Sequence, residues 1–275
     1  MNLTDNFKQD ITLAVNVWTE LLNEYFSDGI EYIFTKGSSV KKWESDIDYV
    51  PIISDVDIHI KLRDKRKLLQ YSNSFEVADS FSKNYEQNFN SSCTDINYTP
   101  THFPRVQIVQ LEFSGRKGYV VPPRQQDVVW IQGKGDFPEE FDHGKLKLMD
   151  KKNLLGEKLF IDSIPNTLLE LSGLEYYTLL YKINSRISPS PIRLLTQVVN
   201  KNPHDIWASN KTSIRNLLLD NNYNEIAEYY EQYYFNGWKL FEKQFMDMSL
   251  YREMIKIGYY LLKNCYSELK KLSID

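Results

Sequence analysis

Residues 32–62 read YIFTKGSSVKKWESDIDYVPIISDVDIHIKL, and this stretch decides how the N-terminal half of the chain folds. It begins with a short run of β-forming residues, 32–35, and then turns at Gly37-Ser38-Ser39. It ends at residues 55–60, where acidic or polar residues alternate with aliphatic ones. This period of two predicts a strand that presents its polar residues on one face and its aliphatic residues to a core on the other.

The polar face of this predicted strand carries Asp55, Asp57 and His59. The two aspartates lie one pleat apart, about 6–7 Å between their Cα atoms, so their charges repel unless a cation lies between them. Mg²⁺ prefers carboxylate oxygens and usually takes one or two of them together with substrate phosphates. The turn at Gly37, Ser38 and Ser39 can offer backbone N–H groups and a hydroxyl to a phosphate. Together these features predict a metal–nucleotide site, whereas an isolated D-x-D pattern more often marks an exposed edge strand.

The turn and the acidic strand resemble the nucleotidyltransferase superfamily that includes polymerase β and the antibiotic nucleotidyltransferases. Its members carry a G-S turn followed by S-D-[IV]-D on the next strand, and Gly37-Ser38 and residues 54–57 match that pattern. The segment between the two is longer than usual and contains a second candidate, SDID at residues 45–48. Pro51 argues against that earlier pair, because proline cannot donate to a central ladder. The later pair is therefore predicted to bind the metal.

The resemblance implies an α+β fold, in which a small mixed β-sheet with flanking helices is followed by an all-α bundle. It also implies Mg²⁺-dependent transfer of a nucleoside monophosphate, AMP from ATP or from another nucleoside triphosphate, onto a hydroxyl. Asp55 and Asp57 would hold two Mg²⁺ ions. A third carboxylate is expected on a neighbouring strand, and Glu112 is the only acidic residue in the strand predicted for residues 105–113. If Glu112 is out of reach, Gln107 or Gln110 is the alternative contact to substrate.

Three basic residues are candidates for the phosphates. Lys36 directly precedes the turn and is either a phosphate ligand or a solvated lysine at a strand end. Lys182 and Arg186 lie four residues apart on one predicted helical face. They either reach the triphosphate or form the solvent side of the helix.

The acceptor does not follow from these motifs, because members of the family modify aminoglycosides, lincosamides, tRNA ends and proteins. The net charge of −4 argues against a large nucleic-acid footprint. An acidic cleft attracts cations, so a small cationic acceptor such as an aminoglycoside antibiotic is favoured, with Glu139, Glu140 and Asp142 contributing. Two alternatives stay open: a non-catalytic nucleotide-binding or interaction protein with a degenerate site, and a toxin-system nucleotidyltransferase acting on tRNA or protein.

Composition and motif searches narrow the remaining classes. The 275 residues contain no run of eighteen apolar residues and no N-terminal signal pattern, so we expect no membrane partner and a cytoplasmic location. The two cysteines, Cys93 and Cys265, form no C-x-x-C motif, as expected for a reduced compartment. The absence of H-E-x-x-H, G-x-G-x-x-G and Walker motifs gives no support to hydrolase or dehydrogenase activity.

Hydrophobic periodicity divides the chain into a catalytic domain, residues 1–150, and a helical C-terminal domain, residues 151–275. In the first, we predict a helix up to about Phe26, a helix over residues 67–88 and a loop over residues 88–99. Short strands are expected at residues 119–123 and 127–132. In the second, Leu168 to Ile183 are assigned to one helix and four further helices follow.

Overall fold

The computed structural model describes residues 3–64, 66–96, 98–110, 123–137 and 142–272. The chain forms two compact units: Met1–Lys41 with Ser54–Glu139, and Lys42–Ile53 with Glu140–Asp275. The first combines a sheet with helices and the second is helical, so the expected mixed α+β class with a small sheet is confirmed. Apart from the segment Lys42–Ile53, the two units divide between residues 139 and 140. The expected boundary at Asp150 falls inside helix α4 (His143–Gly156).

The sheet of the first unit has the order β3-β2-β1-β4 within the described residues. Strand β1 runs antiparallel to both of its neighbours, whereas β2 and β3 run parallel. The parallel pair requires a crossover connection, and two helices between β2 and β3 supply it. The strands are β1 (Ile30–Lys36), β2 (Val56–Leu62), β3 (Val106–Gln110) and β4 (Val129–Gln132).

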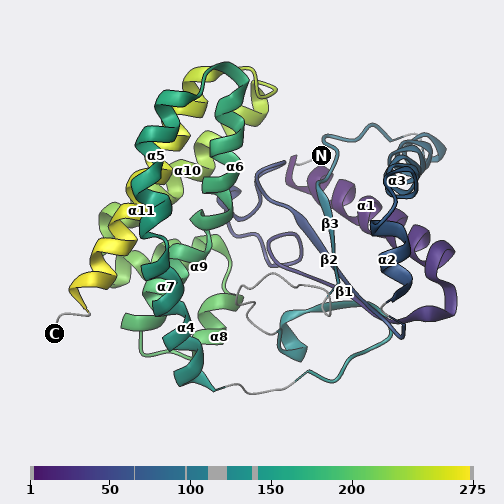
Figure 1. Cartoon of the computed structure of the whole chain (residues 1–275), viewed down its shortest axis with the longest axis horizontal. Coiled ribbons are helices and arrows are strands. Elements are labelled where there is room, and N and C mark those ends of the chain that lie inside the picture. The colour runs from purple at the N-terminus through teal and green to yellow at the C-terminus, as the bar shows by residue number, and fades with distance from the viewer. Residues whose placement is uncertain (1–2, 65, 97, 111–122, 138–141, 273–275) are drawn as a thin grey trace. The chain divides into compact units, whose positions relative to one another are not determined.

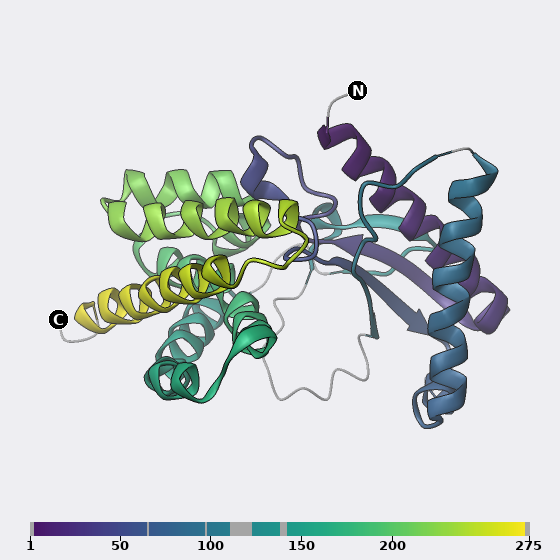
Figure 2. The same cartoon turned by 90° about the horizontal axis from the view of Figure 1, so that it is seen from above.

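Helices α1 (Leu3–Phe26), α2 (Arg66–Ser72) and α3 (Phe75–Asp95) lie on one side of this sheet (Figures 1 and 2). Its aliphatic face packs against apolar residues of α1 and α3. The single helix predicted over residues 67–88 is wrong at two points, because the chain divides it between α2 and α3, whose N-cap is Ser74, and because α3 continues to Asp95. The polar run after residue 88 stays helical because Phe89 and Cys93 extend the apolar stripe and are buried in this core.

The second unit is built from helices whose buried faces share one core. Helix α11 runs alongside α10, as Figure 2 shows in yellow and yellow-green, and also packs against α6 and α7. The core is rich in fully buried tyrosines, among them Tyr230, Tyr233 and Tyr251. Besides α4, the helices are α5 (Lys158–Glu170), α6 (Tyr176–Ile187), α7 (Pro189–Val198), α8 (Pro203–Ala208), α9 (Lys211–Asp220), α10 (Asn224–Glu242) and α11 (Met248–Lys271).

The single helix expected from Leu168 to Ile183 is wrong, because the chain breaks between α5 and α6. Ser172 and Glu175 form a capping box there, and Gly173 adopts a positive φ of 53°. These features end one helix and begin the next. Leucines on both sides of the break keep a helical spacing, which hides it from a periodicity argument.

Candidate metal–nucleotide site

Strand β2 has the alternation that its sequence predicted. Val56, Ile58 and Ile60 are fully buried, and Ile58 and Ile60 belong to the core that the sheet forms with α1 and α3. Asp57 belongs to the other face, where it lies directly opposite Lys36 on β1. Asp55 precedes the strand by one residue. Burial and the negative charge of Asp55 raise the pKa of Asp57 to about 7, against smaller opposing effects of Lys36 and Arg105.

The glycine turn lies beside this aspartate. Gly37 follows β1 with φ of 90°, a conformation that favours glycine, and its carbonyl accepts hydrogen bonds from Val40 N and Lys41 N. A Cβ atom at Gly37 would lie 3.6 Å from Asp57 Oδ2. Nearby in the turn, the Oγ of Ser39 is buried without a hydrogen-bond partner in the described part of the chain. A buried hydroxyl in this state is a group that a bound ligand can satisfy.

Two arginines that the sequence did not single out complete the charges around the site. Arg105 Nη2 donates to Asp55 Oδ2 at 3.1 Å. Arg124 donates through Nε and Nη2 to the two carboxylate oxygens of Asp127, at 2.7 and 3.0 Å. Neither arginine belongs to a sequence motif. Arg105 pairs with an aspartate 50 residues away, and Arg124 pairs with Asp127 across a short 3₁₀ turn.

Lys36 sits among these acidic groups at the end of β1. Burial lowers its pKa, and the attraction of Asp57 and Asp127 opposes that shift only in part. The cation is therefore held close to the aspartate on the neighbouring strand. This position is compatible with contact to a phosphate and differs from that of a freely solvated lysine.

His59 is the third polar residue that the sequence places on this face of β2. Its ring is buried and stacks on Phe34, with centroids 4.7 Å apart and the planes parallel within 1°. Burial and the positive charge of Lys36 lower its pKa to about 3, so the imidazole is neutral at pH 7. Neither ring nitrogen has a hydrogen-bond partner among the described residues.

Three of the predicted acidic residues fall in segments that the structure does not describe. Glu112, the expected third carboxylate, lies outside the described residues, as do Glu139 and Glu140. The backbone register of β3 places Gln107 opposite Asp57 and Gln110 opposite Ile60. The described strand β3 has the sequence VQIVQ and therefore carries no acidic residue.

The C-terminal candidates belong to the second unit. Lys182 is exposed on α6. The Arg186 guanidinium donates to Glu157 Oε2 at 2.8 Å and lies over the ring of Phe160 at 3.9 Å. Asp142 accepts a hydrogen bond from Lys145 N as the N-cap of α4. Arg186 and Asp142 therefore have structural partners inside the helical unit.

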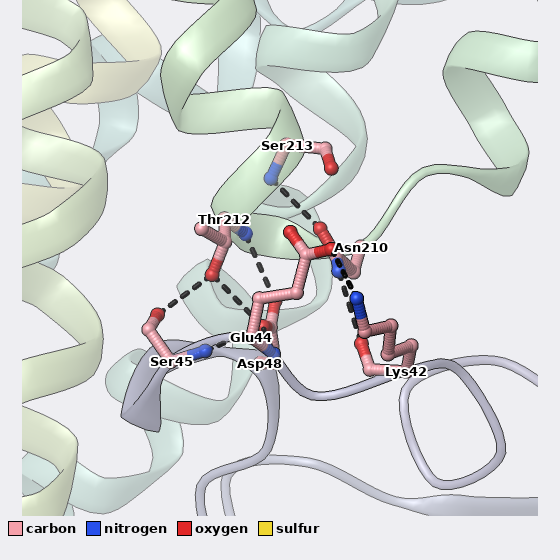
Figure 3. Close-up of polar contacts among 7 residues, drawn as sticks. All are labelled: Lys42, Glu44, Ser45, Asp48, Asn210, Thr212 and Ser213. Atoms are coloured by element: carbon pink, nitrogen blue, oxygen red, sulfur yellow. Dashed lines mark hydrogen bonds and ion pairs between the residues drawn. The ribbon is translucent and has the colours of Figure 1, made fainter.

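The competing SDID sequence has a different structure, drawn in Figure 3. Residues Asp46–Asp48 form a 3₁₀ turn, and the segment Lys42–Ile53 belongs to the helical unit. The buried Asp48 carboxylate accepts hydrogen bonds from Glu44 N, Ser45 N, Thr212 N and Thr212 Oγ1, at 2.7, 3.1, 2.9 and 2.8 Å. Asp48 therefore caps its own turn and satisfies the Thr212 N–H in the first turn of α9, whose N-cap is Asn210. The expectation that this pair lies outside a strand is confirmed.

The side chains at this site fit a magnesium ion whose remaining coordination positions are filled by a bound ligand. Asp55 and Asp57 supply two carboxylates, and Mg²⁺ is usually held by one or two carboxylates with substrate phosphates and water. In the described ranges, no group of three or more His, Cys, Asp or Glu side chains is placed to hold a metal ion. The orphaned Oγ of Ser39 lies in the turn that would face such phosphates.

Comparisons with family models, with curated proteins and with solved structures found no match to this chain. Among the helices that the structure describes, none has the length and apolar character required to cross a membrane.

Proposed function

We propose that this protein is a Mg²⁺-dependent nucleotidyltransferase, which moves a nucleoside monophosphate from ATP or another nucleoside triphosphate onto a hydroxyl of a small-molecule acceptor. The observation that carries the proposal is the proximity of the glycine-serine turn to the acidic strand. The Cβ position of Gly37 lies 3.6 Å from Asp57 Oδ2, although sixteen intervening residues separate Ser38 from Asp55, of which Lys42–Ile53 belong to the other unit.

Each residue has a role that follows from its surroundings. Asp55 and Asp57 would hold the metal, since their mutual repulsion is relieved by a cation. The backbone after Gly37 and the hydroxyl of Ser39 would bind the phosphate tail, with Lys36 adding positive charge beside it. When bound, magnesium would neutralise charge on the phosphates and lower the pKa of the attacking hydroxyl.

A second candidate function is nucleotide binding without transfer. It is favoured by the register of β3, which puts Gln107 rather than a carboxylate beside Asp57. A base that accepts the proton of the acceptor typically contributes about 10²–10⁴-fold to the rate. A site without such a base would keep metal and nucleotide affinity and lose most of the turnover.

The test is pyrophosphate release by the full chain with Mg²⁺ and each nucleoside triphosphate, measured with and without a panel of acceptors that includes aminoglycosides. We expect Asp57→Ala to abolish release, because one of two metal ligands is lost. Asp64→Ala is the matched control, since Asp64 pairs with exposed Arg66 in the same unit.

The outcomes separate the two functions. Release that depends on an acceptor and on Asp57 supports transfer. Nucleotide binding without release, and with the same dependence on Asp57, selects the binding function. Activity of Asp57→Ala near that of the wild type contradicts both assignments of the site.

A further inference from the structure

Arg105 lies where the backbone of β3 meets the acidic end of β2. Its carbonyl accepts a hydrogen bond from Val56 N at 2.9 Å, which fixes its Cα beside that strand. Its side chain reaches back to Asp55, with Nη2 donating to Oδ2 at 3.1 Å. The ion pair therefore occupies an oxygen of one of the two carboxylates assigned to the metal.

The Arg105–Asp55 pair is partly buried, and its side chains are more exposed than those of the Arg124–Asp127 pair. The exposed fractions of the Arg105 and Asp55 side chains are 27% and 34%, whereas that of Arg124 is 7%. Arg124 also makes a bidentate contact with the carboxylate of Asp127. Because both side chains of the Arg105–Asp55 pair keep part of their surface in water, solvent screens the pair, and a charged ligand can replace Arg105 at Asp55.

A metal ion and the guanidinium compete for Asp55. Each needs lone pairs of the same carboxylate, and the positive charge of Arg105 also disfavours a second cation nearby. A guanidinium that leaves a carboxylate keeps its preference for planar oxygen pairs, and a phosphate offers such a pair. The phosphates of a metal-bound nucleotide would bring this second partner to the same place.

We propose that Arg105 is an exchangeable counter-ion of the site, which holds Asp55 when no metal is bound and transfers its guanidinium to a phosphate when metal and nucleotide bind. The inference rests on the proposed function, because it requires a metal–triphosphate ligand. It adds to the site a residue that the resemblance does not supply. It also predicts that removing Arg105 strengthens metal binding and weakens triphosphate binding.

The test uses the full chain and two probes: Mn²⁺ alone, titrated by electron paramagnetic resonance, and inorganic tripolyphosphate with Mg²⁺, titrated by calorimetry. For R105Q we expect Mn²⁺ to bind about threefold more tightly, from the loss of a partly buried ion pair and of one positive charge. We expect tripolyphosphate to bind about tenfold more weakly, from the loss of a charge-assisted hydrogen bond.

R66Q is the matched control, since it also removes an arginine–aspartate pair, with Arg66 Nη2 at 3.0 Å from Asp64 Oδ2, and should change neither affinity. R105K is the second variant and decides the question if R105Q fails to fold. It keeps a positive charge for Asp55 and lacks the planar fork, so Mn²⁺ affinity should stay within about twofold while tripolyphosphate binding weakens.

Opposite changes in the two affinities for R105Q support the proposal. Mn²⁺ binding that is unchanged or weaker in R105Q, or tripolyphosphate binding that is unchanged in both variants, overturns it and leaves the proposed function intact. If the wild-type chain binds neither Mn²⁺ nor tripolyphosphate, whether ATP is absent or present, the proposed function itself is overturned.

Discussion

Replacing Asp48 by alanine should destabilise the helical unit strongly, because this carboxylate joins two segments that are far apart in the sequence. Asp48 is 2% exposed and accepts hydrogen bonds from Glu44 N, Ser45 N and two groups of Thr212. The partners at Thr212 lie 164 residues away, at the N-terminus of α9. The truncation therefore leaves three backbone N–H groups without their acceptor, whereas the Thr212 hydroxyl keeps its contact with Ser45 Oγ at 2.6 Å.

The size of the effect follows from these donors. Leaving a buried donor unsatisfied costs about 1–3 kcal/mol. Because exposed Ser45 and Glu44 can regain water and the Thr212 hydroxyl keeps Ser45 Oγ, we count the Thr212 N–H fully and expect Asp48→Ala to lower the free energy of unfolding by about 2 kcal/mol. Thr212→Val removes only the hydroxyl donor and should cost about 1 kcal/mol.

The assay is urea unfolding of the full chain followed by tryptophan fluorescence, since Trp207 and Trp238 lie in this unit. Asp46→Ala is the matched control from the same SDID sequence: its side chain is exposed, and we expect a change within about 0.5 kcal/mol. An Asp48→Ala variant as stable as Asp46→Ala would refute the reasoning. A double variant with Thr212→Val should show non-additive losses, because the two side chains share one hydrogen bond.

Two further perturbations concern the first unit. The pKa of Asp57 is raised to about 7 in the folded protein from an ordinary value of 3.8, so the folded state binds more protons between these values. The metal-free protein should therefore lose stability as pH rises from about 4 to 7, with a slope of at most about 1.4 kcal/mol per pH unit, and Asp57→Asn should flatten this dependence in urea titrations. Mn²⁺ affinity should rise over the same pH range; a pH-independent affinity would contradict this assignment. Gly37→Ala should cost about 1–2 kcal/mol in thermal unfolding because φ at Gly37 is 90°, whereas Gly156→Ala, with open space around its Cβ position and an ordinary φ, should be neutral or slightly stabilising.

Local patterns in the sequence predicted much of the first unit. The alternation in residues 55–60 gives the two faces of β2, and the SDID sequence before Pro51 forms a 3₁₀ turn outside the sheet, as the proline predicted. The predictions failed where a break or an extension left the apolar spacing unchanged. Helix α3 extends past residue 88 through buried Phe89 and Cys93, and the break near Gly173 lies between leucines that keep a helical spacing.

The amino-acid sequence alone determined the class of the fold, the strand faces, and the pairing of a glycine-serine turn with an acidic strand. These are properties of neighbouring residues, set by side-chain period and backbone preference. Tertiary structure alone decided which distant polar partners meet: Arg105 with Asp55, and Asp48 with the N-terminus of α9. Electrostatic partners depend on distance in space, and these two pairs join residues that are 50 and 164 positions apart in the sequence. The segment Lys42–Ile53 belongs to the helical unit for the same reason, since its hydrogen-bond partners come from the far end of the chain.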